Sequence, residues 1–223
     1  MKIRHLVGSL VLAMSVVSAQ DFMTSIGQKS RALLFTFNGL NTLGAGNFNG
    51  GIGGKYFLSP AMAVRGGLQF GTSHTTISAN PIAPATGTDG SNTSMQYGLS
   101  AAMEYHLLPT RVSPYVGAGV SVSSMTTEAK NAVIGAPPPA QTTVKNAAGG
   151  GAGLRLGAGG LLGVEFFLTK EISLSTEYML GFNMNNPYDQ EVINGATTTT
   201  TKGNPFWGIN VSTVGFLTLS VYF

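Results

Sequence analysis

Few residues of this chain have the types and spacing that enzyme chemistry needs. A serine nucleophile needs a base beside it, and the candidate pair outside the N-terminal segment is Ser73 with His74. A metal site is not indicated, because the chain has no cysteine and no histidine pair at ligand spacing. The glycine repeats never complete the GxGxxG phosphate motif. The sequence therefore predicts a protein that is not an enzyme and that holds no cofactor or metal.

The ionisable residues instead fall at alternate positions within segments that pair polar with apolar residues. This set, which we call the lumen charges, is Lys55, Arg65, Glu104, His106, Arg155, Glu165 and Glu177. All except Arg155, which should lie higher, fall within a few residues of a short turn. Charges enclosed away from water are costly unless paired, so we expect them to pair across one interior. Two interpretations stay open: a structural plug of ion pairs, or a gated conduit for protons, ions or small solutes.

Segments with a period of two are the elements that must position these charges. Residues 94–107 place Met95, Tyr97 and Leu99 on an apolar face, while Gln96 and Ser100 fall on a small, polar face. Such alternation is typical of strands with two different environments. The predicted strands are 31–38, 50–58, 63–71, 94–107, 115–123, 153–168, 172–183 and 207–223.

The connections between these strands alternate strictly between short and long. Short ones follow the second, fourth and sixth strands, and long polar ones follow the first, third, fifth and seventh. This asymmetry is typical of an up-and-down barrel with short periplasmic turns and long outer loops. We therefore predict an all-β fold, an eight-stranded antiparallel up-and-down transmembrane β-barrel with both termini periplasmic.

Composition favours a membrane protein of this class. Charged residues make up 9% of the chain, against about 25% in soluble domains. Beyond the first 20 or so residues there is no apolar run of the roughly 20 residues that a spanning helix needs. A closed barrel is the other way to satisfy every backbone group in lipid.

The N-terminus predicts export. Lys2 and Arg4 precede the apolar stretch 6–17, and Val17-Ser18-Ala19 is a small-residue cleavage site. We expect 1–19 to be a signal peptide and 20–223 to be the barrel domain. Loss of Lys2 and Arg4 lowers the formal charge from +3 to +1, and no basic patch indicates nucleic-acid binding.

Aromatic residues on the apolar parity cluster at two heights. Barrels in membranes carry such rings at both interfaces. The predicted girdles are Tyr56, Tyr105, Phe166 and Phe223 near the short turns, and Phe37, Phe70, Tyr97, Phe182 and Trp207 near the long loops. The loops themselves, including APPPA at 136–140 and five threonines at 197–201, are expected to be either solvated, mobile spacers or ligand-binding tips.

Two motifs resemble a known family. The segment RVSPYVGAGV at 111–120 is similar to a periplasmic turn and following strand of small outer-membrane barrels akin to outer membrane proteins A and X. The C-terminal GFLTLSVYF resembles their terminal assembly signal, here carried by Leu217, Leu219, Val221 and Phe223. The resemblance implies a porin-like barrel in the outer membrane that meets the barrel-assembly machinery during biogenesis.

The expected function is structural and interactive. The barrel would anchor in outer-membrane lipid and lipopolysaccharide as a monomer and present four loops to an unknown surface ligand. The alternative is a narrow, gated pore for ions or small solutes. Conductance and the effect of cutting the loops distinguish the two.

Overall fold

The structure, a computed structural model, describes residues 27–37, 47–80, 82, 85–135 and 139–223. The predicted signal peptide lies outside these residues. None of the described residues forms a helix long and apolar enough to cross a membrane.

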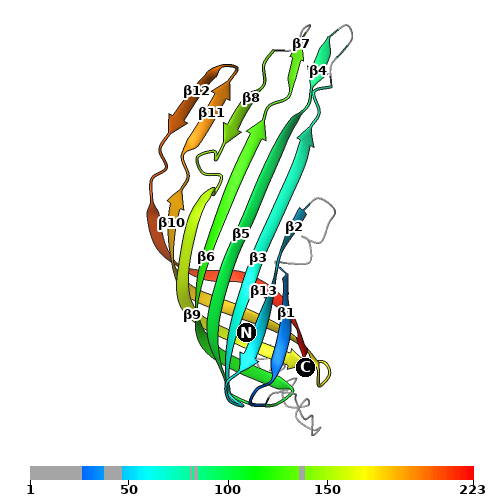
Figure 1. The fold of residues 1–223 in the computed structure, drawn as a ribbon, viewed down its shortest axis with the longest axis vertical. Coiled ribbons are helices and arrows are strands. Elements are labelled where there is room, and N and C mark those ends of the chain that lie inside the picture. Colours follow the sequence, from blue (N-terminus) through cyan, green and yellow to red (C-terminus); the bar gives the residue numbers. More distant parts are fainter. Residues whose placement is uncertain (1–26, 38–46, 81, 83–84, 136–138) are drawn as a thin grey trace, which may run out of the picture.

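The fold is a closed antiparallel barrel of eight strands (Figure 1). Each strand pairs with its neighbour in the ring, and β13 returns to pair with β1, so that Phe35 lies opposite Leu219. The eight-stranded up-and-down prediction is confirmed. In ring order the strands are β1 (Arg31–Phe37), β2 (Asn47–Phe57), β3 (Met62–Ile77), β5 (Gly90–His106), β6 (Val112–Lys130), β9 (Gly153–Phe167), β10 (Ile172–Pro187) and β13 (Phe206–Tyr222).

Side chains alternate between the two faces as the period of two predicts. Along β5, Leu99 and Met103 are about half exposed on the outer face, whereas Glu104 and His106 are buried within the barrel. Outward leucines such as Leu68 and Leu180 are also more than half exposed. An apolar belt of this kind suits lipid as its solvent.

The short connections are tight turns closed by their own hydrogen bonds. Between β2 and β3 the Leu58 amide donates to the Met62 carbonyl at 2.8 Å, and Ser59 Oγ accepts from the Met62 amide at 3.0 Å. Between β9 and β10 the Leu168 amide bonds the Ile172 carbonyl at 2.9 Å. We call this the short-turn end, and β13 also finishes there.

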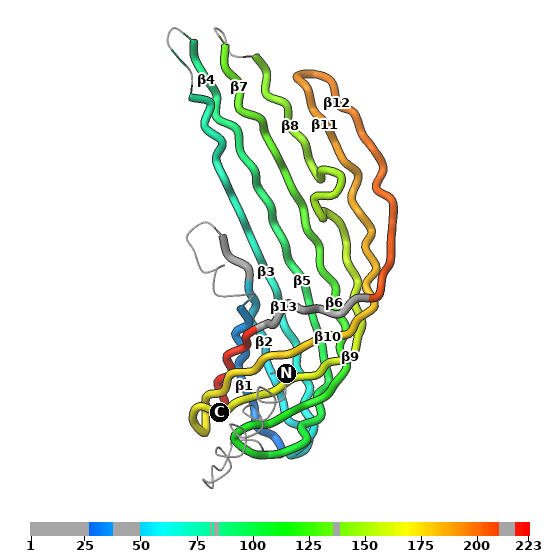
Figure 2. Tube along the Cα trace, turned by 180° about the vertical axis from the view of Figure 1, so that it is seen from behind, coloured from blue at the N-terminus to red at the C-terminus, as the bar shows by residue number. Residues whose placement is uncertain are grey.

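Several strands continue far beyond the other end of the ring, which corrects the expected strand limits and loops. The sequence predicts loop for residues 72–77, 90–93 and 124–130, but these extend β3, β5 and β6. These extensions and the added strands form one curved wall above the barrel, which we call the raised sheet (Figures 1 and 2). The added strands are β8 (Thr142–Lys145), β11 (Gln190–Asn194) and β12 (Thr197–Thr201), with a separate pair of β4 (Thr86–Thr88) and β7 (Val133–Gly135).

The run of five threonines is therefore a strand rather than a mobile spacer. Threonine is β-branched and favours strands, and Gly195, with φ +58, supports the turn that joins β11 to β12. Of the APPPA segment, 136–138 lie outside the described residues.

Candidate functional site

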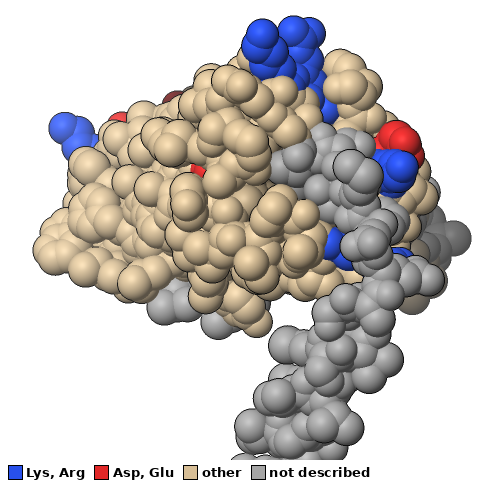
Figure 3. Space-filling model, turned by 90° about the horizontal axis from the view of Figure 1, so that it is seen from below, with Lys and Arg blue, Asp and Glu red and all other residues tan. Residues whose placement is uncertain are grey.

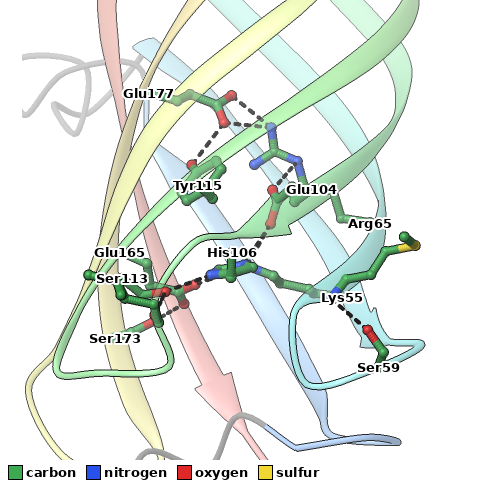
Figure 4. Close-up of polar contacts among 12 residues, drawn as sticks. Lys55, Ser59, Arg65, Glu104, His106, Ser113, Tyr115, Glu165, Ser173 and Glu177 are labelled. Atoms are coloured by element: carbon green, nitrogen blue, oxygen red, sulfur yellow. Dashed lines mark hydrogen bonds and ion pairs between the residues drawn. The ribbon is translucent and has the colours of Figure 1, made fainter.

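Buried charges fill the lumen near the short-turn end (Figure 4). Lys55 from β2 lies between two carboxylates, with Nζ 2.7 Å from Glu104 Oε2 and 2.9 Å from Glu165 Oε2. The side chains of both glutamates are at most 1% exposed, and that of Lys55 is 4% exposed. Because removing either sign would leave the other uncompensated, these groups form one interdependent unit.

Arg65 links this unit to a third carboxylate higher in the lumen. Its Nε lies 3.1 Å from Glu104 Oε1, and its Nη2 bonds both oxygens of Glu177 at 2.8 and 2.6 Å. Such charge-assisted bonds are about twice as strong as neutral ones and fix geometry. The guanidinium therefore ties β3 to both β5 and β10 across the interior.

His106 completes the unit from below. The Ser113 hydroxyl donates its proton to the Leu108 carbonyl at 2.7 Å. Its Oγ is therefore the acceptor for His106 Nδ1, which donates to it at 2.8 Å. Its Nε2 faces carboxylate oxygens of Glu104 and Glu165 at 3.4 and 3.9 Å. The imidazole thus packs against two carboxylates without a hydrogen bond from Nε2 to either, and its serine neighbour, Ser113, is buried rather than facing solvent.

Uncharged residues that sequence reasoning missed satisfy the remaining oxygens. Tyr222 OH donates to Glu165 Oε1 at 2.6 Å, Ser173 Oγ donates to the same atom, and Tyr115 OH donates to Glu177 Oε2 at 3.1 Å. Tyr115 reaches over β9 to Glu177 on β10 because its partner in the ladder is Gly163, where any Cβ would collide with the phenol ring. The alternation of the strands could have identified these residues, since it places their side chains inward, next to the short turns and the lumen charges.

Aromatic and aliphatic side chains close the lumen beneath the charges. Phe57 and Phe167 are fully buried, and Tyr222 lies between them with ring centroids 6.3 and 5.4 Å away. Seen from the short-turn end, most of the visible face is uncharged, and most charged side chains lie at its edge, where acidic atoms also lie beside a lysine or arginine (Figure 3). We call the charged unit and this floor together the lumen plug.

Above the plug the lumen holds a cavity of about 230 Å³. Arg65 and Glu177 line its lower part, and small residues such as Gly67, Ser100 and Gly119 line its walls. Water and small ions fit such a space, but the plug separates it from the short-turn end.

The structure brings all the predicted lumen charges together except Arg155. This residue is exposed at the start of β9, and its Nη2 donates to the Gly151 carbonyl at 2.8 Å. Arg155 and Glu165 lie ten residues apart on one strand, or about 33 Å at ~3.3 Å per residue. Arg155 lies higher, as expected, but its predicted place in the shared network is wrong, because this separation is beyond the reach of side-chain pairing.

The aromatic residues lie on the outward parity. Tyr97, Tyr105 and Phe70 are about half exposed, and Phe182 packs against Trp207 with centroids 5.9 Å apart. The remaining predicted girdle residues are Phe37, Tyr56, Phe166 and Phe223. Their roles at the membrane interfaces stay a prediction.

The C-terminal positions of the predicted assembly signal also share one parity. Leu217, Leu219 and Val221 alternate with the buried Thr218, Ser220 and Tyr222 along β13. Recognition of this pattern by assembly machinery stays a prediction.

The structure places no additional catalytic group beside the candidate pair Ser73 and His74 among the contacts of His74 that it describes. His74 is exposed, and its Nδ1 lies 2.9 Å from Thr93 Oγ1. Among the described residues no group of three histidine or acidic side chains could hold a metal ion. Absence of enzymatic activity stays a prediction.

Comparison with known proteins identifies the family. The family model described as outer membrane protein beta-barrel domain matches residues 9–204, which is most of the chain, so the protein belongs to this family. It is an outer-membrane β-barrel protein. No curated protein matches it.

Two solved structures are similar to it at low identity. A major outer membrane protein from Thermus thermophilus is 14% identical with a TM-score of 0.49, and the match covers 87% of this chain and 99% of that one. The N-terminal β-barrel domain of Pseudomonas aeruginosa OprF is 15% identical with a TM-score of 0.32, and the match covers 88% of this chain and 99% of that one.

Proposed function

We propose that this protein is a monomeric outer-membrane anchor that uses its raised sheet for contacts at the cell surface. The observation that carries the proposal is the continuation of β3, β5 and β6 beyond the barrel, where β8, β11 and β12 join them in one sheet. A barrel needs only about 9–11 residues per strand to cross a membrane, whereas β6 has 19. The additional length is not required for anchoring.

The free edge of β12 supports a contact role. The two-residue turn pairs Asn194 with Thr197, so the antiparallel alternation points the backbone groups of Thr198 and Thr200 away from β11. In the described part of the chain no other strand pairs with this edge. Open edges without charge, proline or bulge readily accept another extended segment, and β12 consists of threonine alone.

The lumen plug favours the hypothesis of a membrane anchor and disfavours the hypothesis of an open channel. Eight strands leave room only for packed side chains, and here charged and aromatic groups fill the short-turn half. The cavity above Arg65 and Glu177 favours a second candidate, a gated pore. Conduction would require the Arg65–Glu177 and Lys55–Glu104 pairs to separate.

Cysteine labelling in intact cells tests the proposed orientation, since the natural chain has no cysteine. We expect a membrane-impermeant maleimide to label Thr199→Cys on the raised sheet. The matched control, Thr169→Cys in a short turn, should be labelled only after the outer membrane is permeabilised. Labelling of the turn variant alone in intact cells would reverse the orientation and remove the surface role.

A hairpin deletion tests the contact function itself. Replacing 190–201 with a short glycine–serine link leaves the ring strands intact, so the barrel should keep its heat-dependent gel mobility. We expect cells displaying the wild type to sediment and attach to surfaces, and cells displaying this variant to lose both properties. Equal behaviour of both proteins would contradict a role for the raised sheet.

A further inference from the structure

Arg155, which stands apart from the lumen plug, lines a second cavity. This cavity of about 580 Å³ lies where β9 begins, β10 ends and the 202–205 connection enters β13. Figure 2 shows this junction between the barrel and the raised sheet. The volume is in the range of small-molecule sites.

The charged side chains that line this cavity are all positive. Arg155 and Lys202 are among the residues that line it, and no aspartate or glutamate is. Within the described residues neither cation forms an ion pair, although the raised sheet holds pairs such as Lys145 with Glu191. The two acidic residues that flank the lining residue Gln190 are engaged elsewhere: Asp189 Oδ1 accepts from the Gly203 amide at 3.2 Å, and Glu191 pairs with Lys145. The cavity therefore offers two cations to an anionic group.

Arg155 is held in position by its own strand entry. Its Nη2 donates to the Gly151 carbonyl, and a Cβ at Gly151 would lie 2.6 Å from that nitrogen. Gly151 also has φ +77, which favours glycine. A side chain at this position would push the guanidinium aside, so glycine leaves room for Arg155 at the cavity wall.

A buried amide lies opposite Arg155. Asn185 is its direct partner in the β9–β10 ladder, so both side chains project from the same face of the sheet. Asn185 is 9% exposed, and its Oδ1 has no hydrogen-bond partner among the described residues. Buried polar atoms are nearly always bonded. A rotation of the terminal amide would offer either a donor or an acceptor to a ligand hydroxyl.

The surrounding walls are preformed. Asn146 Nδ2 donates to the Asp189 carbonyl at 3.3 Å, and the Ala148 amide donates to Gln190 Oε1 at 3.2 Å. These bonds join the 146–152 loop to the end of β10 and the start of β11. A ligand would find the cavity formed already, which lowers the entropy cost of binding.

We propose that this cavity binds an anionic saccharide. Arg155 and Lys202 would hold its phosphate or carboxylate, because guanidinium groups recognise both in bidentate fashion. Asn183, Asn185 and Asn204 would bond its hydroxyls, since amides both donate and accept. The inference rests on the proposed function, which turns this end of the barrel outward, and it gives the surface contact a chemical class.

Calorimetric titration of the refolded full chain in detergent micelles tests the proposal. We expect glucose 6-phosphate or glucuronate to bind, and glucose and inorganic phosphate to bind at least about tenfold more weakly. Arg155→Gln and Lys202→Gln should each lower the affinity about tenfold or more. The matched control, Lys145→Gln on the raised sheet, should leave it unchanged.

The same titration distinguishes the sources of the sugar. Lipopolysaccharide added to the micelles would block the soluble sugar if the site takes a lipid headgroup, and would leave binding intact if it takes a free saccharide. The proposal is overturned if neither anionic sugar binds the wild type at millimolar concentration, if phosphate alone binds as tightly, or if the three variants behave alike. Because Thr199→Cys labelling reports orientation separately, labelled cells with a silent titration would refute this inference and leave the surface role standing.

Discussion

The two ends of this molecule use the same strands in opposite ways. At the short-turn end, β5, β9 and β10 point Glu104, Glu165 and Glu177 into a closed lumen, and the side chains of Lys55 and its two glutamates are at most 4% exposed. In the raised sheet the pair of Lys145 and Glu191, at 3.5 Å, leaves each side chain more than 40% exposed.

This difference shows what charge contributes in each environment. In the lumen Lys55, Glu104 and Glu165 depend on one another, because they are buried and water cannot compensate for the loss of a partner. In the raised sheet water screens the pairs, and they contribute little. The lower half is thus fixed by its ion pairs, whereas the upper half depends on its backbone ladder.

The largest expected effect is loss of the central cation. Lys55→Met leaves Glu104 and Glu165 without their shared partner, and should lower the free energy of unfolding by about 3–5 kcal/mol. Urea unfolding of the refolded protein, followed by fluorescence of Trp207, the single tryptophan, measures the change. A loss below about 1 kcal/mol would mean that the cluster is solvated and not a plug.

A charge on the lipid face should rank next. Leu99→Arg places a cation on the outer surface of β5 and should cost about 2–4 kcal/mol. Ser100→Arg is the matched control, because its side chain enters the 230 Å³ lumen cavity and should cost much less. Equal losses in the same unfolding assay would be incompatible with the register described above.

A single buried hydroxyl should have a smaller effect. Tyr115→Phe keeps the ring against His106 but removes the bond to Glu177, for an expected loss of about 1.5–3 kcal/mol. Tyr188→Phe removes a neutral hydroxyl–hydroxyl bond to Ser124 that is exposed in the raised region, and should cost less than about 1 kcal/mol. A larger loss of unfolding free energy for Tyr188→Phe than for Tyr115→Phe would contradict the difference between the two ends.

The smallest expected effect belongs to the exposed ion pair. Lys145→Met removes the contact with Glu191 and should change stability by at most about 1 kcal/mol, less still at high salt. Unfolding in low and high salt measures it. A loss as large as that of Lys55→Met would erase the distinction between the two ends.

Much of the barrel could be predicted from the sequence because membrane strands obey two strong constraints. Alternation in 94–107 assigned Leu99 outward and Glu104 inward, and the alternating connector lengths set the strand order. Both follow from closure of a sheet in lipid. The enclosed charges near the short turns followed from the same parity.

The raised sheet and the separation of Arg155 from the lumen network were not predicted, for separate reasons. The biased composition of the 197–201 loop favours a solvated spacer. The strand propensity of threonine and the turn at Gly195 instead favour the hairpin of β11 and β12. Arg155 was expected to lie higher yet to share the network, because it has the parity of Glu165, and parity does not show which inward side chains are close enough to pair. The roles of Tyr115 and Tyr222 were not predicted, because an inward tyrosine gives no sequence signal that its hydroxyl bonds a buried carboxylate.

Conductance in a planar bilayer tests the central claim, that the lumen is plugged, most directly. The refolded wild type is measured beside a variant with Glu104, Glu165 and Glu177 changed to Gln, after both show heat-dependent gel mobility. We expect the wild type to be silent because paired charges and Phe57 and Phe167 fill the short-turn end. Discrete wild-type steps that change in the variant would show that the charged lumen is an ion path, and would contradict the plug.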